Sequence, residues 1–266
     1  MESIKTILLC AAFSWLGNAL GIVATEIDEN DGVFQFKVTG WSAIESAYVS
    51  KGRTCHDGLT WNPCMSVSDI RVNDIIIPAY MGYWGEFSLS ETDLYPLEKP
   101  GKWIEADPYA GIEWTHYLPW EKYIRVKTWC LRWHFPATDR QPMDMSAIDI
   151  TGRTFLKPST SWRYRYNGST EGRVEIRLGC SEEYVFFEDS RLFGGLNGWL
   201  IDYTLEDDAK ESGLSSCDLT LGLGWKWLYV KAVYWFPFDR RVLNDGTATY
   251  GYDKSLVFIA GVRFVL

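Results

Sequence analysis

Apolar and polar side chains alternate at every second position along almost every segment of this chain. Within 103–116, for example, Ile104 and Ile112 share one parity and Glu105 has the other. Alternation of this kind is typical of β-strands that have one apolar and one polar face. No segment shows a sustained helical period of about 3.6 residues. The chain is therefore expected to be all-β.

Twelve segments carry this pattern, and an even number of strands is what single-chain bacterial barrels contain. The predicted strands are Phe34–Val49, Trp61–Ile70, Ile75–Leu89, Trp103–His116, Tyr123–Phe135, Ala147–Thr154, Ser161–Tyr166, Arg173–Tyr184, Leu196–Leu205, Ser216–Trp227, Leu228–Phe236 and Leu256–Leu266. Their connections alternate between long and short, as in barrels with long external loops and short periplasmic turns. Only the connection 185–195 is long on the side of the barrel where short turns are expected, and it could hide a strand extension.

Ionisable side chains fall on one parity of these strands and apolar ones on the other. Arg or Lys on the lipid face at the middle of a bilayer would cost about 2 to 4 kcal/mol, so the charged parity is expected to face a central lumen. A water-soluble lipocalin-like barrel would have the reverse polarity, with an apolar interior. The lumen-lining residues predicted in this way are Glu45, Glu86, Glu105, Asp107, Glu113, Arg125, Lys127, Arg163, Arg165, Arg173, Glu175 and Arg177.

The two ends of the chain and its aromatic content agree with a transmembrane barrel. The last residues, 256–266, form an apolar strand, and the 14 Trp, 15 Tyr and 13 Phe would supply interfacial girdles. Residues 1–24 resemble a signal peptide, with a short apolar core and small residues before Ala24. We therefore expect a short periplasmic segment at 25–32, and a single twelve-stranded antiparallel barrel over 33–266 in the outer membrane of a diderm bacterium.

The predicted lumen charges divide by strand, which would set an acidic wall against a basic wall. The acidic wall is Glu86, Glu105, Asp107 and Glu113, and the basic wall is Arg125, Lys127, Arg163, Arg165 and Arg177. Such a transverse field suits a narrow channel or a solute-binding lumen. Alternatively, the charges pair and plug the lumen of a structural barrel whose external loops, chiefly 237–255, bind a partner. Expected partners are outer-membrane lipids and small solutes; the net charge of −9 disfavours nucleic acid.

Cysteine and histidine positions bear on disulfides, metals and catalysis. Cys55 and Cys64 flank the first external loop and could form a disulfide in an oxidising compartment. There is no CxxC motif, so a zinc site is not expected. No metal ligand and no cofactor are assigned. An outer-membrane lipid-modifying enzyme would need a serine and a histidine near the external interface. Only His134 is suitably placed, and no Gly-x-Ser-x-Gly motif occurs, so no catalytic residue is assigned.

Four short motifs resemble a family of uncharacterised outer-membrane barrels labelled Gcw_chp, which is grouped with TorF-type porins. They are the stretch 46–52 (SAYVSKG), the strand led by Pro63, the stretch 81–86 (MGYWGE) and the stretch 157–162 (KPSTSW). The resemblance covers residues 33–184. The sequence departs from the family pattern at Lys51, where arginine is usual, and in its additional cysteines. The resemblance implies an outer-membrane location and a barrel fold, and it implies no substrate.

Overall fold

The structure is a computed structural model that describes residues 34–51, 53–73, 75–91, 100–120, 122–136, 141–168, 170–206, 210–239, 242 and 255–265. The predicted signal peptide and N-terminal segment, 1–32, lie outside the described residues. No helix in the described part of the chain is long and apolar enough to cross a bilayer.

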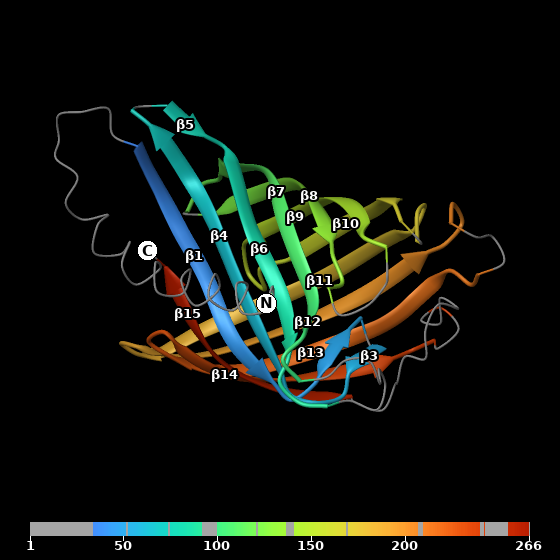
Figure 1. Cartoon of the computed structure of the whole chain (residues 1–266). Helices are drawn as coiled ribbons and strands as arrows, with labels where there is room; N and C mark the ends of the chain where they lie inside the picture. Colours follow the sequence, from blue (N-terminus) through green and yellow to red (C-terminus); the bar gives the residue numbers. More distant parts are fainter. Residues whose placement is uncertain are drawn as a thin grey trace.

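Twelve antiparallel strands form a closed ring (Figure 1). They are β1 (Phe34–Glu45), β4 (Thr60–Val72), β6 (Ala79–Ser88), β7 (Trp103–Tyr117), β8 (Tyr123–Trp133), β9 (Met143–Arg153), β10 (Ser159–Asn167), β11 (Val174–Phe187), β12 (Ser190–Asp202), β13 (Gly213–Trp225), β14 (Leu228–Pro237) and β15 (Leu256–Val265). Each strand pairs with its neighbours in sequence, and β1 pairs with both β4 and β15. The predicted twelve-stranded antiparallel barrel is therefore confirmed.

The seam between β1 and β15 joins the first strand to the last. Its register runs from Thr39 opposite Val265 to Glu45 opposite Ile259. Gly40 is required on β1, because a Cβ at that position would lie only 2.5 Å from the backbone carbonyl oxygen of Cys64 on β4, and equally close to a ring carbon of Phe264 on β15. With this seam closed, the ring leaves no exposed edge strand in the wall.

Three short strands are not members of the ring. β2 (Tyr48–Ser50) and β3 (Arg53–His56) pair only with each other, and β5 (Ile75–Ile77) extends the sheet beyond β4. β5 and β3 lie at opposite ends of the barrel in Figure 1. The predicted first strand was therefore too long, because β1 ends at Glu45 and the chain then enters a separate hairpin.

The connection predicted as long at 185–195 is a tight turn instead. β11 runs to Phe187 and β12 begins at Ser190, so only Glu188 and Asp189 lie between the two strands. All turns at this end of the barrel are consequently short. We call it the short-turn end, and the opposite end the long-loop end.

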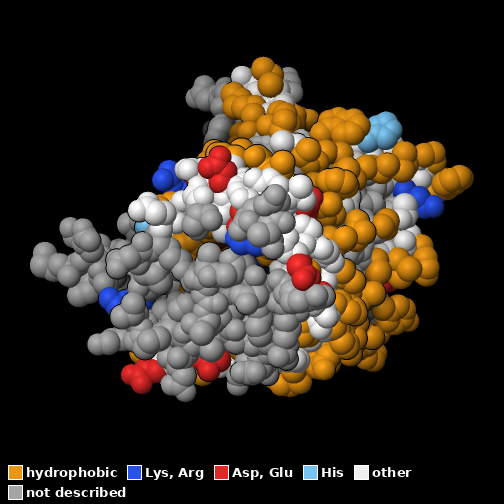
Figure 2. Space-filling model, turned by 90° about the vertical axis from the view of Figure 1, so that its right-hand side faces the viewer, with side chains coloured by type: hydrophobic (Ala, Val, Ile, Leu, Met, Phe, Trp, Pro, Cys, Tyr) orange, Lys and Arg blue, Asp and Glu red, His pale blue; other side chains and the backbone are white. Residues whose placement is uncertain are grey.

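The two faces of the wall differ in polarity, as β13 illustrates. Leu219, Leu221 and Leu223 are 48–60% exposed on its outer face, whereas Asp218 is 5% exposed on the inner face. Figure 2, in which the molecule of Figure 1 is turned by 90°, shows hydrophobic side chains gathered along the outer wall. The wall is therefore apolar outside and carries polar and charged groups inside.

Candidate functional site

The β2–β3 hairpin, residues 48–56, lies inside the barrel and is called the inner hairpin below. Its Tyr48 hydroxyl donates a hydrogen bond of 2.9 Å to Glu105 on β7. On the other side, Lys51 Nζ lies 2.6 Å from Glu175 on β11, and the Lys51 carbonyl accepts a hydrogen bond of 2.8 Å from the Ser216 hydroxyl on β13. Because β7 is four strands from β11 and six from β13, the inner hairpin must cross the interior to make these contacts.

Apolar packing holds the first strand of the inner hairpin. Val49 belongs to a buried cluster on the inner face of the barrel that includes Val233, Val257 and Ile259. These residues come from β14 and β15 near the long-loop end. The inner hairpin therefore contacts the wall on several sides at this end, through both apolar and polar groups.

Lys51 is one of two buried cations of the inner hairpin, together with Arg53. Its side chain is 6% exposed and that of Glu175 is fully buried. The ammonium also lies 5.5 Å from the Trp133 ring centroid and 6.0 Å from that of Trp199, within the range of cation–π attraction. Sequence reasoning missed this residue as part of the lumen, because the stretch after Ser50 reads as an external loop.

The structure brings three residues of the acidic wall together on neighbouring strands. Glu86 accepts a hydrogen bond of 2.7 Å from the Asn62 amide, and Asp107 accepts one of 3.3 Å from the His134 backbone N–H. Glu105 lies opposite Glu86 in the β6–β7 register. Glu45 lies on β1 and lines the cavity described below. These carboxylates occupy one side of the long-loop half of the barrel.

Three arginines of the basic wall lie on β10 and β11. Arg165 pairs with Glu175 and donates a hydrogen bond of 2.7 Å to the Thr170 hydroxyl. Arg163 and Arg177 lie 5.2 and 5.8 Å from the Trp199 ring centroid. Neither of these two arginines forms an ion pair with any carboxylate in the described ranges. Glu175 thus serves as counter-ion to both Arg165 and Lys51.

Three residues predicted to face each other across the lumen pair locally instead. Glu113 on β7 lies 3.1 Å from Arg125 and 2.6 Å from Lys127, both on the adjacent strand β8. Neighbouring strands place these side chains side by side on one face. Their charges are therefore compensated within the wall, and the division into two walls rests on the other residues.

Arg173 lies just before β11 and belongs to a cluster at the long-loop end. Its Nε and Nη2 donate hydrogen bonds of 2.8 and 3.2 Å to the carboxylate of Glu206, which also contacts Lys210 at 2.5 Å. Burial favours a raised pKa for Glu206, but the hydrogen bonds from Arg173 and Lys210 outweigh it and lower the pKa. Arg173 therefore binds the loop residue Glu206 at this end of the barrel.

The candidate disulfide between Cys55 and Cys64 is absent, because both are free thiols. Cys64 is fixed in the register of β4, and its Sγ lies 3.9 Å from the Tyr109 hydroxyl. Cys55 is in the inner hairpin, where its Sγ lies 3.7 Å from the Arg53 carbonyl oxygen. The prediction was wrong because it treated residues 51–60 as an external loop closed at its base, whereas Arg53–His56 pair with Tyr48–Ser50 in a separate two-stranded sheet.

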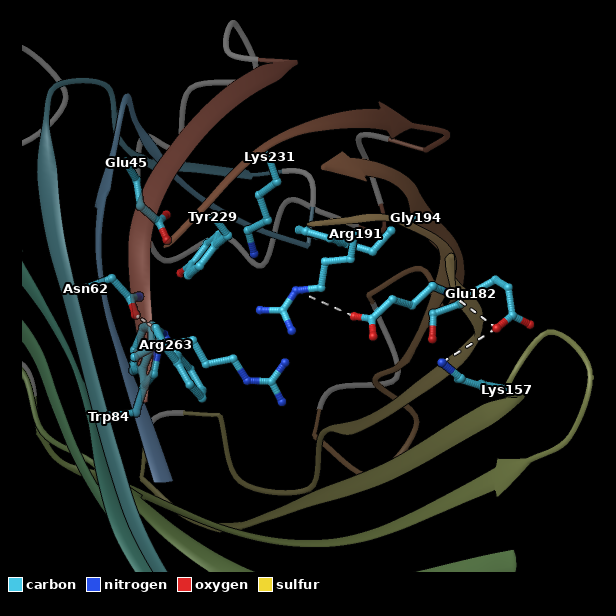
Figure 3. A pocket seen from close by; sticks show the side chains of 14 residues that line it. Glu45, Asn62, Trp84, Lys157, Glu182, Arg191, Gly194, Tyr229, Lys231 and Arg263 are labelled. Atoms are coloured by element: carbon cyan, nitrogen blue, oxygen red, sulfur yellow. Dashed lines mark hydrogen bonds and ion pairs between the residues drawn. The ribbon is translucent and has the colours of Figure 1, made fainter. Parts of the chain in front are cut away.

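A cavity of about 520 Å³ lies in the interior and reaches from Glu45 and Asn62, in the long-loop half, to Lys157 and Arg191 at the short-turn end (Figure 3). Its lining includes the charged residues Glu45, Lys157, Glu182, Glu183, Arg191, Lys231 and Arg263, and the aromatic residues Trp41, Trp84, Phe193 and Tyr229. Arg191 and Lys231 were absent from the predicted lumen set. Once β12 is extended to Ser190, the same alternation places Arg191 on the inner face.

Comparisons with known proteins found similarity to solved structures only. No family model matches the chain, and no curated protein matches it, so the resemblance to Gcw_chp proteins stays a prediction. Among solved structures, an outer-membrane channel of Pseudomonas putida F1 aligns with a TM-score of 0.42 and 10% identity over 90% of this chain and all of that one. OmpT of Vibrio cholerae aligns with a TM-score of 0.40 and 10% identity over 90% of this chain and 99% of that one. OmpF of Salmonella typhi, in complex with daunomycin, aligns with a TM-score of 0.36 and 7% identity over 91% of this chain and all of that one.

Proposed function

We propose that this chain is an outer-membrane barrel that forms a narrow channel or solute-binding lumen. Its outer wall carries leucines, valines and aromatic residues at the positions that would meet hydrocarbon. Its interior carries charged residues at positions that would meet water. The long loops would face outward, and both ends of the mature chain would lie in the periplasm. We assign no catalytic role and no cofactor.

The observation that carries this proposal is the inner hairpin spanning a lumen with separated charges. Tyr48 reaches the acidic wall through Glu105, and Lys51 reaches Glu175 among the arginines of β10 and β11. A solute crossing the long-loop end must therefore pass the inner hairpin or displace it. We propose that the inner hairpin sets the conductance and that the flanking charges select solutes.

Planar-bilayer recording tests this proposal with the wild-type barrel and a variant in which residues 49–55 are replaced by a short Gly-Ser linker. The wild type is expected to show small or infrequent conductance steps, and the variant larger and more frequent ones. Heat-modifiable gel mobility verifies that both are folded. Absence of current from both folded proteins would contradict a channel.

That negative outcome would favour the alternative of a plugged structural barrel. The specific observation on its side is the extensive attachment of the inner hairpin, through Val49 as well as Lys51 and Tyr48. External loops would then carry the function by binding a partner. Most of the loop at 237–255 lies outside the described residues, and its deletion should abolish partner binding if this alternative holds.

A further inference from the structure

The cavity in the barrel interior brings together cations from three different strands. Arg191 comes from β12, Lys231 from β14 and Arg263 from β15. Figure 3 shows the guanidinium groups of Arg191 and Arg263 directed into the middle of the cavity from opposite sides. Like charges directed into one enclosed space repel each other, and a bound anion would relieve that repulsion.

These cations are poorly compensated by the acids that share the cavity. Among these acids, Arg191 has only a long contact of 3.9 Å with Glu183, and its Nη2 donates one hydrogen bond of 3.3 Å to the Lys226 carbonyl oxygen. Arg263 and Lys231 form no ion pair with a carboxylate in the described part of the chain. Glu182 is occupied elsewhere, because it accepts a hydrogen bond of 3.0 Å from the Leu156 N–H and lies 3.5 Å from Lys157. The guanidinium groups therefore retain free donors.

Four aromatic residues also line the cavity. Trp41, Trp84, Phe193 and Tyr229 contribute ring surfaces beside the cations. A guanidinium matches the planar geometry of a carboxylate or phosphate with two parallel hydrogen bonds, and aromatic walls favour a flat apolar body. A volume of about 520 Å³ lies within the range of small-molecule sites, about 300 to 1,000 Å³.

We propose that this cavity binds a small organic anion whose carboxylate or phosphate lies between Arg191 and Arg263 and whose flat apolar part packs against the aromatic residues. The inference deepens the proposed function by naming a solute class, and it rests on that function only in treating the lumen as open to solutes at the short-turn end.

Isothermal titration calorimetry on the folded full-length barrel in detergent tests the proposal without transport. The probes are benzoate and phenyl phosphate, which distinguish a carboxylate site from a phosphate site, and benzamide as the neutral counterpart of benzoate. The variants are Arg263→Gln, Arg191→Gln and Arg263→Lys. Arg132→Gln is the matched control, because Arg132 also loses one charge but lies near Asp144, outside this cavity, with its side chain 61% exposed.

At least one anion is expected to bind more tightly than benzamide, and higher salt should weaken its binding. Loss of a charged hydrogen bond should reduce affinity at least about tenfold in Arg263→Gln and Arg191→Gln. Arg263→Lys should fall between these variants and wild type, and Arg132→Gln should match wild type. Failure of both anions to bind more tightly than benzamide, or unchanged affinity for the anion in Arg263→Gln, would overturn the inference. A barrel that binds the anion yet conducts no current would refute the channel and leave the binding site standing.

Discussion

Replacing Lys51 with methionine should loosen the inner hairpin without unfolding the barrel. Lys51 Nζ lies 2.6 Å from Glu175, and both side chains are nearly or fully buried. In the variant, Glu175 keeps Arg165 as its counter-ion, so no carboxylate is left wholly unpaired. The loss is that of one buried charged contact, expected to cost as much as a hydrogen bond to a charged group, about 1.5 to 3 kcal/mol. The population with a detached inner hairpin should therefore rise about 10- to 150-fold.

Thiol labelling measures this population directly. Thr54 of the inner hairpin is 1% exposed, so a cysteine placed there by Thr54→Cys, in an otherwise cysteine-free background, should react with a soluble maleimide only when the hairpin detaches. The labelling rate should rise by the same factor in Lys51→Met. Lys37→Met is the matched control, because the Lys37–Asp69 pair is exposed and 3.8 Å long, and such pairs contribute about 0 to 1 kcal/mol. Equal labelling rates in the Lys51 and Lys37 variants would refute the reasoning.

Three further predictions concern stability. Glu175→Gln should destabilise the folded barrel by about 3 to 5 kcal/mol, more than Lys51→Met, because it leaves buried cations without their counter-ion; denaturant titration in lipid vesicles measures the difference, and equal costs would contradict the shared counter-ion. Burial favours a raised pKa for Glu206, but hydrogen bonds from two cations lower it. The contribution of Glu206 to stability is therefore complete above its unfolded pKa of about 4.3 and is lost as the pH falls toward the lower folded value. Between about pH 7 and 3, the thermal midpoint should fall less in Glu206→Gln than in wild type. An equal fall in both proteins would count against this role. Leu221→Arg, on the outer face, should cost about 2 to 4 kcal/mol in lipid, whereas Thr220→Arg on the inner face should cost less in the same titration; the reverse order would mean that the faces are exchanged.

The barrel could be predicted because lipid and water impose opposite demands on successive residues of a strand. Glu105 and Ile104, adjacent in sequence, illustrate this alternation, and the same pattern located all twelve strands. Strand ends were less certain, because apolar residues are tolerated at both faces near the interface. The aromatic run ending at Phe187 therefore looked like part of a connection, although it extends β11.

The inner hairpin could not be predicted, because its position depends on contacts with residues far away in the sequence. Lys51 is separated from Glu175 and Ser216 by long stretches of chain. The residues next to Lys51 in sequence would look the same if they belonged to an external loop. Alternation of side chains also predicts the face on which each charged residue lies, but it does not predict which residue it pairs with. For this reason Glu113 was placed on the acidic wall, although it pairs with Arg125 and Lys127 on the next strand.

Site-directed spin labelling along β13 tests the sidedness of the wall most directly. Labels placed one at a time at positions 218–223 of the barrel in lipid bilayers report contact with oxygen, which concentrates in hydrocarbon, and with a water-soluble nickel chelate. Leu219, Leu221 and Leu223 should show high oxygen and low nickel accessibility, and the intervening positions the reverse. If oxygen and nickel accessibility rose and fell at the same positions, or if nickel reached the leucine positions, the result would contradict a membrane-spanning barrel with a charged interior.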